Sequence, residues 1–359
     1  MTVSSHIEAG FKLKKDLVAT PTDFLGATLK ERPVPLDNSK QGWSFDGTKY
    51  ITNAIANLEE NIKKKGLPPL PKKALTPFPS GYRPEIDTTD ELNDEDTGWY
   101  QELIGILRWA VELGRIDIQY EVTALSSHIA LPRQGHLKVA MYIFAYLKRA
   151  PNRWILMDPR YPSPFQGTEP PIYSDWDHLY PDAAEQLPPE IPKPRGKHVE
   201  ITCFVDADHA ANRVTRRSHT GILIFVNMAP VIWYSKRQNT VESSSFGSEF
   251  IAMRIAVDQI EALRYKLRMF GVPLGTFPDL TALPATIYCD NQSVVTNSSD
   301  ALSKLNKKHN SIAFHRVREA CAGGWISVRK IDTGTNWADL LTKALSADVR
   351  MKHIDSFMY

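Results

Sequence analysis

Cysteine is scarce in this 359-residue chain: three occur, too few for a disulfide framework and without the paired spacing of a zinc site. Long hydrophobic runs are missing as well, because stretches such as "AMYIFAYL" fall far short of the roughly 18 residues of a membrane-spanning helix. The first residues lack the apolar core of a secretion signal. We therefore expect an intracellular protein, in the cytoplasm or the nucleus, that is not inserted in a membrane.

A strong net charge is also absent. Lysine and arginine number 43 against 41 aspartates and glutamates, which leaves a formal charge of +2. This balance gives no general attraction to nucleic acid, so an anionic partner would have to be bound by local basic clusters. The hydrophobic fraction of 42% is that of an ordinary globular protein.

Proline, by contrast, is concentrated in one region. Eleven of the 25 prolines lie between Pro151 and Pro194, where fixed φ angles and missing amide donors exclude a helix or a central strand. We predict a proline-rich linker over residues 151–197. It separates a segment at 1–150 from a domain at 198–346, and a tail follows at 347–359.

The segment before the linker shows helical periodicity. Apolar residues recur three or four apart in "WYQELIGILRWAVELG" and "GHLKVAMYIFAYLKR", and a further helix is predicted in "YITNAIANLEENIKKK". The segment is therefore expected to be mainly helical. Without a partner, its apolar stripes would be exposed and could recruit another chain.

The domain after the linker alternates strands and helices. Strands are predicted in "HVEITCFVDADHA", in both halves of "TGILIFVNMAPVIWYSKR", in "ATIYCDNQ" and in "WISVRKI". A long helix runs from Phe246 to Gly271, a second one stops at the glycine pair of "NSIAFHRVREACAGG", and "NWADLLTKAL" starts a last one. This order of elements predicts an α/β fold.

Four acids stand at positions that a surface role explains poorly when they are taken together. Asp206 ends the first predicted strand, Asp290 ends the fourth, Glu249 lies beside the apolar stripe of the long helix, and Asp339 lies in the first turn of the last helix. Each one alone is also explained as a loop acid that caps a turn, and Asn336 with Asp339 is close to a capping box.

If these carboxylates converge, their mutual repulsion requires compensating cations. Oxygen ligands favour Mg²⁺, with Mn²⁺ as a substitute, and no histidine and cysteine cluster competes for zinc. Two such ions about 4 Å apart can activate a water and stabilise the leaving oxygen in phosphodiester cleavage. The sequence thus predicts a nuclease with two Mg²⁺ ions.

The motifs also resemble a known family. "FVDADHA", "RRSHTGILIF", "PVIWYSKRQNTVESSSFGSEFIAM", "IYCDNQSVV", "NKKHNSIAFHRVREA" and "NWADLLTKAL" are similar, in order and spacing, to the ribonuclease H domain of copia-type retrotransposon polyproteins. Upstream pieces such as "DFLGATLKE" and "LPRQGHLKVAMYIFAYLKR" resemble the part of the polyprotein that follows the reverse-transcriptase active site. The resemblance implies a ribonuclease H-like mixed five-stranded sheet with flanking helices, preceded by a helical segment like the thumb or connection of a reverse transcriptase.

The resemblance also implies roles for single residues. The metal-binding acids of the family fall on Asp206, Glu249, Asp290 and Asp339, whereas Asp208 would be a neighbour. His309 matches a mobile loop histidine that helps the product leave. His315, which helical spacing beside Ile312 places in the interior, is the weaker candidate.

The implied substrate is an RNA–DNA hybrid, which such enzymes read by backbone charge, groove shape and 2′-hydroxyls rather than by base edges. Candidate contacts are basic or amide side chains near the acid-bearing ends of the strands: Arg216, Arg217, Lys236, Arg237, Asn239, Gln292, Lys307 and Lys308. Each basic cluster also has a plain explanation as a solvated surface. Trp233 and Tyr234 alternate in a strand, so one is expected to face the core and the other a groove.

The chain departs from the family pattern in one important respect. The Tyr-x-Asp-Asp turn of reverse transcriptases is absent, so DNA synthesis is not expected. The chain looks like a fragment that starts after the polymerase centre, and reverse-transcriptase or integrase parts of the same polyprotein are possible partners. The alternative to an active ribonuclease H is an inactive relic that binds nucleic acid or a polymerase partner.

Overall fold

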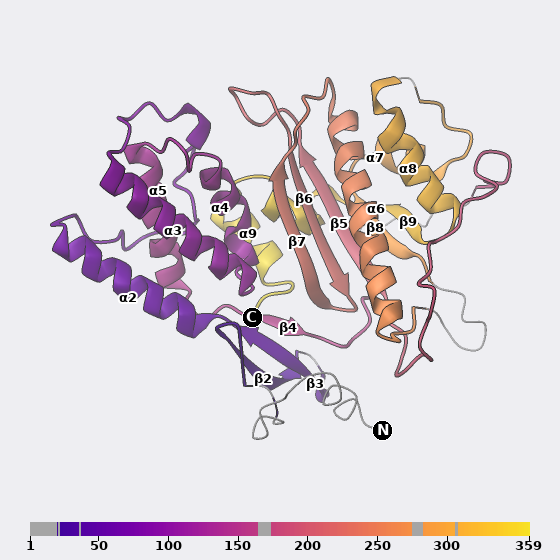
Figure 1. Cartoon of the computed structure of the whole chain (residues 1–359), viewed down its shortest axis with the longest axis horizontal. Helices are drawn as coiled ribbons and strands as arrows, with labels where there is room; N and C mark the ends of the chain where they lie inside the picture. The colour runs from indigo at the N-terminus through magenta and orange to yellow at the C-terminus, as the bar shows by residue number, and fades with distance from the viewer. Residues whose placement is uncertain (1–19, 21, 36, 164–173, 275–282, 306–307) are drawn as a thin grey trace.

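The computed structural model describes residues 1–359 except 1–19, 21, 36, 164–173, 275–282 and 306–307. Its described part contains a five-stranded sheet at the centre and a helical N-terminal region beside it (Figure 1). A second, four-stranded sheet lies below the helical region in that view. None of the described helices has both the length and the apolar character that crossing a membrane requires.

The central sheet has the order β7-β6-β5-β8-β9. Its strands are β5 (Ile201–Asp208), β6 (His219–Val226), β7 (Ala229–Arg237), β8 (Ala285–Cys289) and β9 (Ile326–Lys330). The first three pair antiparallel, whereas β5, β8 and β9 are parallel. This mixed sheet has the predicted ribonuclease H-like arrangement, and the predicted fold class is confirmed.

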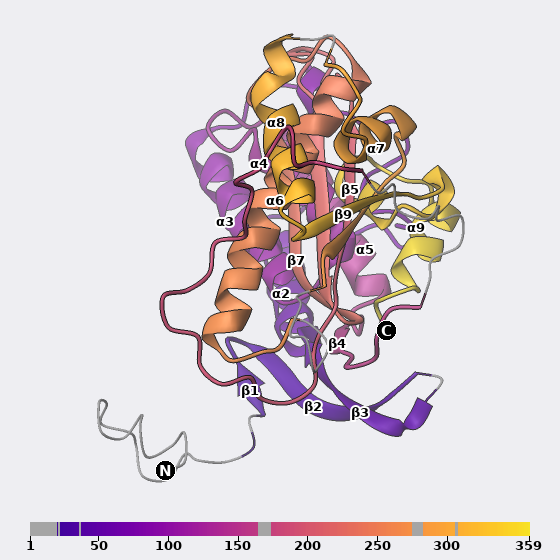
Figure 2. The ribbon, with the colours of Figure 1, turned by 90° about the vertical axis from the view of Figure 1, so that its right-hand side faces the viewer.

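Each face of the sheet is covered by different elements. On one face lie α6 (Ser245–Met269), α7 (Gln292–Ser299) and α8 (Ser311–Ala322), whose apolar residues share a core with the sheet; the edge view in Figure 2 shows α6 lying along it. On the other face lie η5 (Trp337–Leu341) and α9 (Ala347–Ile354). Because strand residues alternate between faces, Cys203 and Val205 face α6 whereas Phe204 and Asp206 face η5.

The N-terminal region contains the predicted helices. They are α2 (Thr48–Lys64), α3 (Asp94–Glu112) and α5 (Gln134–Arg149), and α4 (Gln119–Ser126) joins them around one core. This region also contains short 3₁₀ turns at Pro84–Ile86 and Ile116–Ile118, and two more occur in the other domain, at Lys308–Asn310 and Thr333–Thr335. The apolar stripes that were expected to be exposed are covered instead: Leu103, Leu107 and Phe144 are buried.

The sequence did not reveal the second sheet. It has the order β1-β2-β3-β4 and consists of β1 (Asp23–Phe24), β2 (Ala27–Val34), β3 (Asp37–Asp46) and β4 (Ile155–Met157). The strand β2 reads "ATLKERPV", whose charged stretch gives little apolar alternation, and β4 lies inside the predicted linker. The region is therefore less purely helical than predicted.

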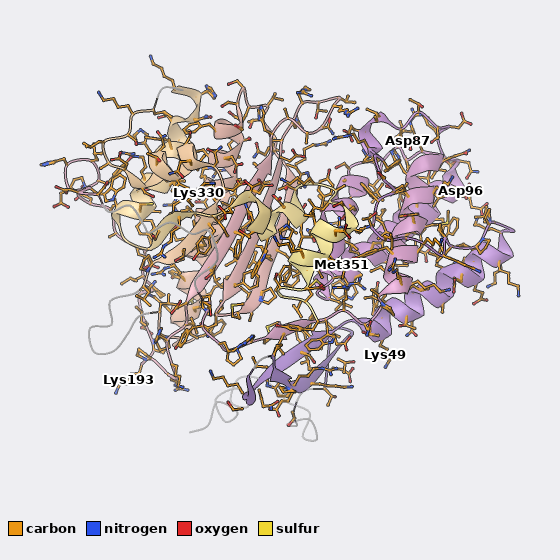
Figure 3. All side chains as sticks on the ribbon, turned by 180° about the vertical axis from the view of Figure 1, so that it is seen from behind. Lys49, Asp87, Asp96, Lys193, Lys330 and Met351 are labelled. Carbon is orange, nitrogen blue, oxygen red and sulfur yellow. The ribbon has the colours of Figure 1, made fainter. Side chains whose placement is uncertain are left out.

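The N-terminal region and the ribonuclease H-like sheet share a core. Ile116 and Ile155 pack with Phe204 of β5 and Ile354 of α9. Figure 3, seen from behind, shows α9, marked by Met351, between the sheet and the N-terminal helices. The guanidinium of Arg350 on α9 contacts the carboxylate of Glu121 on α4, and both side chains are buried. The domain boundaries stay a prediction, and the predicted tail at 347–359 contains α9, which packs between the two parts.

Two local predictions about helices were wrong. The segment "NWADLLTKAL" contains the 3₁₀ turn η5 instead of starting an α-helix. The amides of Asp339 and Thr342 bond to carbonyl oxygens three residues earlier, and the Thr342 hydroxyl donates to Asp206 of β5. His315 is exposed, and its Nδ1 lies 2.7 Å from the Tyr180 hydroxyl. It lies on the outer side of α8 next to Ile312, which is 83% exposed, so helical spacing had assigned the wrong face.

Candidate metal centre

Asp206 lies at the middle of the site. It is buried within β5, which continues two residues further than predicted, and its partner in register on β6 is Gly221. A Cβ added at Gly221 would lie 2.7 Å from the Ala338 carbonyl oxygen and 2.6 Å from Cγ2 of Thr342. Glycine at this position therefore lets η5 approach the sheet, and the Thr342 hydroxyl donates a hydrogen bond to the Asp206 carboxylate.

Glu249 reaches the same place from helix α6. The helix begins at the N-cap Ser244, whose side chain accepts a hydrogen bond from the Gly247 amide, so Glu249 lies in its first two turns. The neighbouring Phe250 and Met253 are fully buried against the sheet, which carries Glu249 inward with them. Its Oε2 atom is buried and has no hydrogen-bond partner within the described part of the chain. Such an orphan acceptor is costly unless a cation or donor binds it.

Asp290 directly follows strand β8, which is parallel to β5. Because parallel strands end at the same edge, Asp290 lies close to Asp206. Ligand oxygens of Asp206, Glu249 and Asp290 all lie within 4.8 Å of one another. Three carboxylates from two strand ends and one helix are thus gathered at a single point, with oxygen ligands of the kind that Mg²⁺ prefers.

Asp339 is not a member of this tight group but is adjacent to it. Asn336 caps the 3₁₀ turn by accepting from the Ala338 amide, which places Asp339 on the inner side of η5. Its Oδ1 lies 2.9 Å from Nζ of Lys343, and the same ammonium lies 3.6 Å from Oδ2 of Asp206. The structure therefore brings three of the four predicted acids together and pairs the fourth with a lysine.

Several carboxyl groups around Asp206 have a raised pKa. Burial, followed by the charge of Asp206, raises the pKa of Glu249 well above its ordinary value, raises the pKa of Asp339 to about 7, and raises the pKa of Asp290. The same two causes raise the pKa of Asp208 to about 6. Bound divalent cations would offset the free-energy cost of ionising these buried, neighbouring carboxyl groups, so the residues present fit a Mg²⁺ or Mn²⁺ site.

These shifts predict a pH dependence of stability in the absence of divalent ions. Between about pH 4 and pH 7 the folded state binds more protons at Asp208 and Asp339 than the unfolded chain does, so the free energy of unfolding falls as the pH rises. Urea unfolding in chelator should show a decline that is steeper in the wild type than in Asp339→Asn, by on the order of 2 kcal/mol over this range. Equal slopes for the two proteins would contradict the shift assigned to Asp339.

Several of the predicted substrate contacts line one groove. It has a volume of about 300 Å³ and includes Lys236, Arg237, Asn239 and His309. The Nε2 atom of His309 lies 3.4 Å from Oε2 of Glu242, which stands in the loop between β7 and α6. Tyr234 also lines this groove, whereas Trp233, its neighbour in β7, packs toward the cores on the opposite side. The structure thus brings His309, the predicted loop histidine, to the same groove as three predicted substrate contacts that precede it by at least 70 residues in the sequence.

The other predicted contacts lie elsewhere. Arg217 lines a small pocket with Arg83, whose Nη1 donates to the Ala211 carbonyl oxygen at 3.0 Å. Arg216 is exposed with a φ of 57°. Gln292 and Lys308 are exposed, at the start of α7 and in the 3₁₀ turn before α8. Lys307 lies outside the described residues.

Sequence reasoning missed two residues of the site. Lys343 and Thr342 both contact Asp206. Both stand in the motif "NWADLLTKAL", in which only Asp339 was predicted to be a site residue. The signal was present, because a lysine four residues after an acid is a common pairing distance. What could not be foreseen is the approach of η5 to the sheet, which brings Lys343 to Asp206 as well.

The strand order and the acidic centre define the class of the domain, a ribonuclease H-like fold with a candidate metal site. Comparison with known proteins then gives its relationship. The chain is similar to retrovirus-related Pol polyproteins of transposons, which confirms the predicted resemblance to a retrotransposon polyprotein. It is 23% identical over 323 residues to the polyprotein of transposon RE1 from Arabidopsis thaliana, covering 90% of this chain and 18% of that protein. It is 24% identical over 246 residues to that of transposon TNT 1-94 from Nicotiana tabacum, covering 68% and 15%. The chain thus spans less than a fifth of these relatives.

Other comparisons add less. No family model matches the chain. Among solved structures, the N-terminal RNase H domain of a Mycobacterium tuberculosis protein, fused to maltose-binding protein, aligns with a TM-score of 0.30 and 14% identity, covering 44% of this chain and 98% of that one. LC11-RNase H1 in complex with an RNA/DNA hybrid aligns with a TM-score of 0.30 and 16% identity, covering 40% and 94%.

Proposed function

We propose that this chain is a ribonuclease H that hydrolyses the RNA strand of RNA–DNA hybrids endonucleolytically and depends on Mg²⁺. The observation that carries the proposal is the gathering of Asp206, Glu249 and Asp290, with ligand oxygens within 4.8 Å, at the edge of a sheet with this strand order. Homology to Pol polyproteins of retrotransposons supports the same conclusion.

The roles of the residues follow from their geometry. Asp206, Glu249 and Asp290 would hold the metal, and Asp339 would complete the site for a second ion. Bound Mg²⁺, replaceable by Mn²⁺, supplies the Lewis acidity for phosphodiester hydrolysis. Lys330 donates a hydrogen bond to the Asp290 carbonyl oxygen and so holds the end of β8 in place.

The substrate would be gripped by its backbone. Lys236, Arg237 and Asn239 offer donors to phosphate and sugar oxygens along the groove, as does His309 when it is protonated. The rim position of His309, with its side chain 54% exposed, suits contact with a phosphate near the cut. These contacts recognise the charge and shape of the nucleic-acid backbone and not the base edges, so we expect little sequence preference.

The test is cleavage of an end-labelled RNA–DNA hybrid in Mg²⁺, compared with the same strands as an RNA duplex and a DNA duplex. We expect cuts in the RNA strand of the hybrid only, and a rate at least about 100-fold lower for Asp290→Asn, because a ligand of the metal is lost. The matched control Asp177→Asn makes the same chemical change at an exposed acid in the segment before β5. This variant should cleave the hybrid like the wild type.

The outcomes separate the candidates. Equal cleavage by the wild type and by Asp290→Asn would show that a contaminating nuclease cuts the hybrid. Binding of the hybrid without any cleavage by the wild type would overturn the proposed activity and favour the inactive relic. Reverse-transcriptase or integrase parts of a polyprotein remain proposed partners, because the chain matches only a small part of its relatives.

A further inference from the structure

The four predicted ligands fall into two unequal sets. Asp206, Glu249 and Asp290 form a compact group of oxygens. Asp339 contacts the ammonium of Lys343 at 2.9 Å, and that ammonium also lies 3.6 Å from Asp206. Asp206 therefore belongs to both sets, because it lies close to Glu249 and Asp290 and also contacts the Lys343 ammonium.

We propose that Lys343 is a built-in counter-ion for the second cation position, so that this chain binds one divalent ion tightly and the second only by displacing the lysine. This inference rests on the proposed function, because it concerns the metal site of that reaction. The first ion would be held by Asp206, Glu249 and Asp290. The second would need Asp206 and Asp339, whose oxygens the Lys343 ammonium contacts.

The electrostatic reason is direct. Two cations within a few ångströms of the same carboxylates repel one another, and the repulsion is strong where burial limits screening by water. Asp206 and Asp339 are buried, whereas the Lys343 side chain is 35% exposed on a flexible four-carbon stem. The lysine can therefore swing out toward solvent, while the carboxylates stay in place on β5 and η5.

A purely structural ion pair would behave differently. A lysine that only fastens η5 to the sheet would change stability when removed but would leave the number of bound ions unchanged. That task is already shared by Thr342, which donates to Asp206, and by Asn336, whose side-chain amide donates to the Val205 carbonyl oxygen at 2.9 Å. The distinguishing readout is thus the stoichiometry and affinity of metal binding rather than stability.

The experiment is a titration with Mn²⁺ alone, without nucleic acid, in which free Mn²⁺ is counted by electron paramagnetic resonance. Lys343→Met keeps an unbranched side chain of similar length and removes its positive charge. We expect the wild type to bind one Mn²⁺ with a second site at least tenfold weaker, and Lys343→Met to bind the second ion at least tenfold more tightly than the wild type does. Lys343→Arg retains the charge and should resemble the wild type.

Lys266→Met is the matched control, because it removes an exposed lysine from the last turn of α6, at the opposite end of that helix from Glu249. We expect its second site to change less than threefold. Two equally tight ions in the wild type, or one ion in both the wild type and Lys343→Met, would overturn the role of Lys343 and leave the proposed function standing. If Lys343→Met does not fold, Lys343→Gln serves as the neutral variant. Failure of the folded wild type and the folded neutral variant to bind any Mn²⁺ would instead overturn the metal site itself.

Discussion

Asp206→Asn is expected to lower the rate of hybrid cleavage at least about 1000-fold, which corresponds to about 4 kcal/mol of lost transition-state stabilisation. Asp206 is the carboxylate that the two sets of ligands share, since it lies with Glu249 and Asp290 and also contacts Lys343. Its replacement therefore weakens both metal positions, whereas loss of Asp339 would weaken one. The rate is measured with the labelled hybrid in Mg²⁺.

The same substitution should not weaken the fold in the absence of divalent ions. The charge of Asp206 raises the pKa of Glu249, Asp290 and Asp339, so its removal relieves repulsion at three neighbours. It forfeits the ionic contact to Lys343 at 3.6 Å, whereas the asparagine amide oxygen can still accept the hydrogen bond from the Thr342 hydroxyl. Thermal unfolding in chelator at pH 8 should therefore give a midpoint equal to or above that of the wild type. A lower midpoint together with a normal cleavage rate would show that Asp206 is a structural residue.

Arg350→Met is expected to destabilise the whole chain by about 3–5 kcal/mol, because it leaves the carboxylate of Glu121 buried without its partner. Burial raises the pKa of Glu121 even though Arg350 is present, so the positive charge of Arg350 does not fully offset the cost of burying this carboxylate. The guanidinium also donates to the Asp117 carbonyl oxygen, within a buried group in which Arg115 and Tyr146 bind the Asp117 carboxylate. Urea unfolding measures the loss.

Two further variants make this prediction specific. Lys352→Met changes an exposed lysine on the same helix and should alter stability by less than about 0.5 kcal/mol. The double variant Arg350→Met with Glu121→Gln removes the unpaired charge, so it should recover part of the loss. If Arg350→Met unfolds within about 1 kcal/mol of the wild type, α9 does not hold the N-terminal helices to the sheet in the way that the structure indicates.

Much of the site could be predicted because it depends on local patterns. The apolar runs before Asp206 and Asp290 mark two strands, and parallel pairing of these strands brings their ends together. Helical spacing placed Glu249 on the buried side of α6, as found. Predicting these three residues required only the periodicity of a strand, the periodicity of a helix and the rule that parallel strands end at the same edge of a sheet.

What could not be predicted depends on contacts between distant segments. The strand β4 pairs with β3 more than 100 residues away, and a three-residue strand in a proline-rich stretch has no recognisable pattern. Lys343 reaches Asp206 only because Gly221 permits close packing of η5. The buried pair of Arg350 and Glu121 is likewise set by the docking of α9, since charged residues normally indicate a surface.

The central claim is that folding gathers Asp206, Glu249 and Asp290 into a site for a divalent cation. Its most direct test is anomalous X-ray scattering from crystals of the protein grown or soaked with Mn²⁺. We expect a strong Mn²⁺ peak within about 2.0–2.3 Å of a carboxylate oxygen from each of these residues. An ordered site that shows these three carboxylates and no Mn²⁺ peak between them would contradict it.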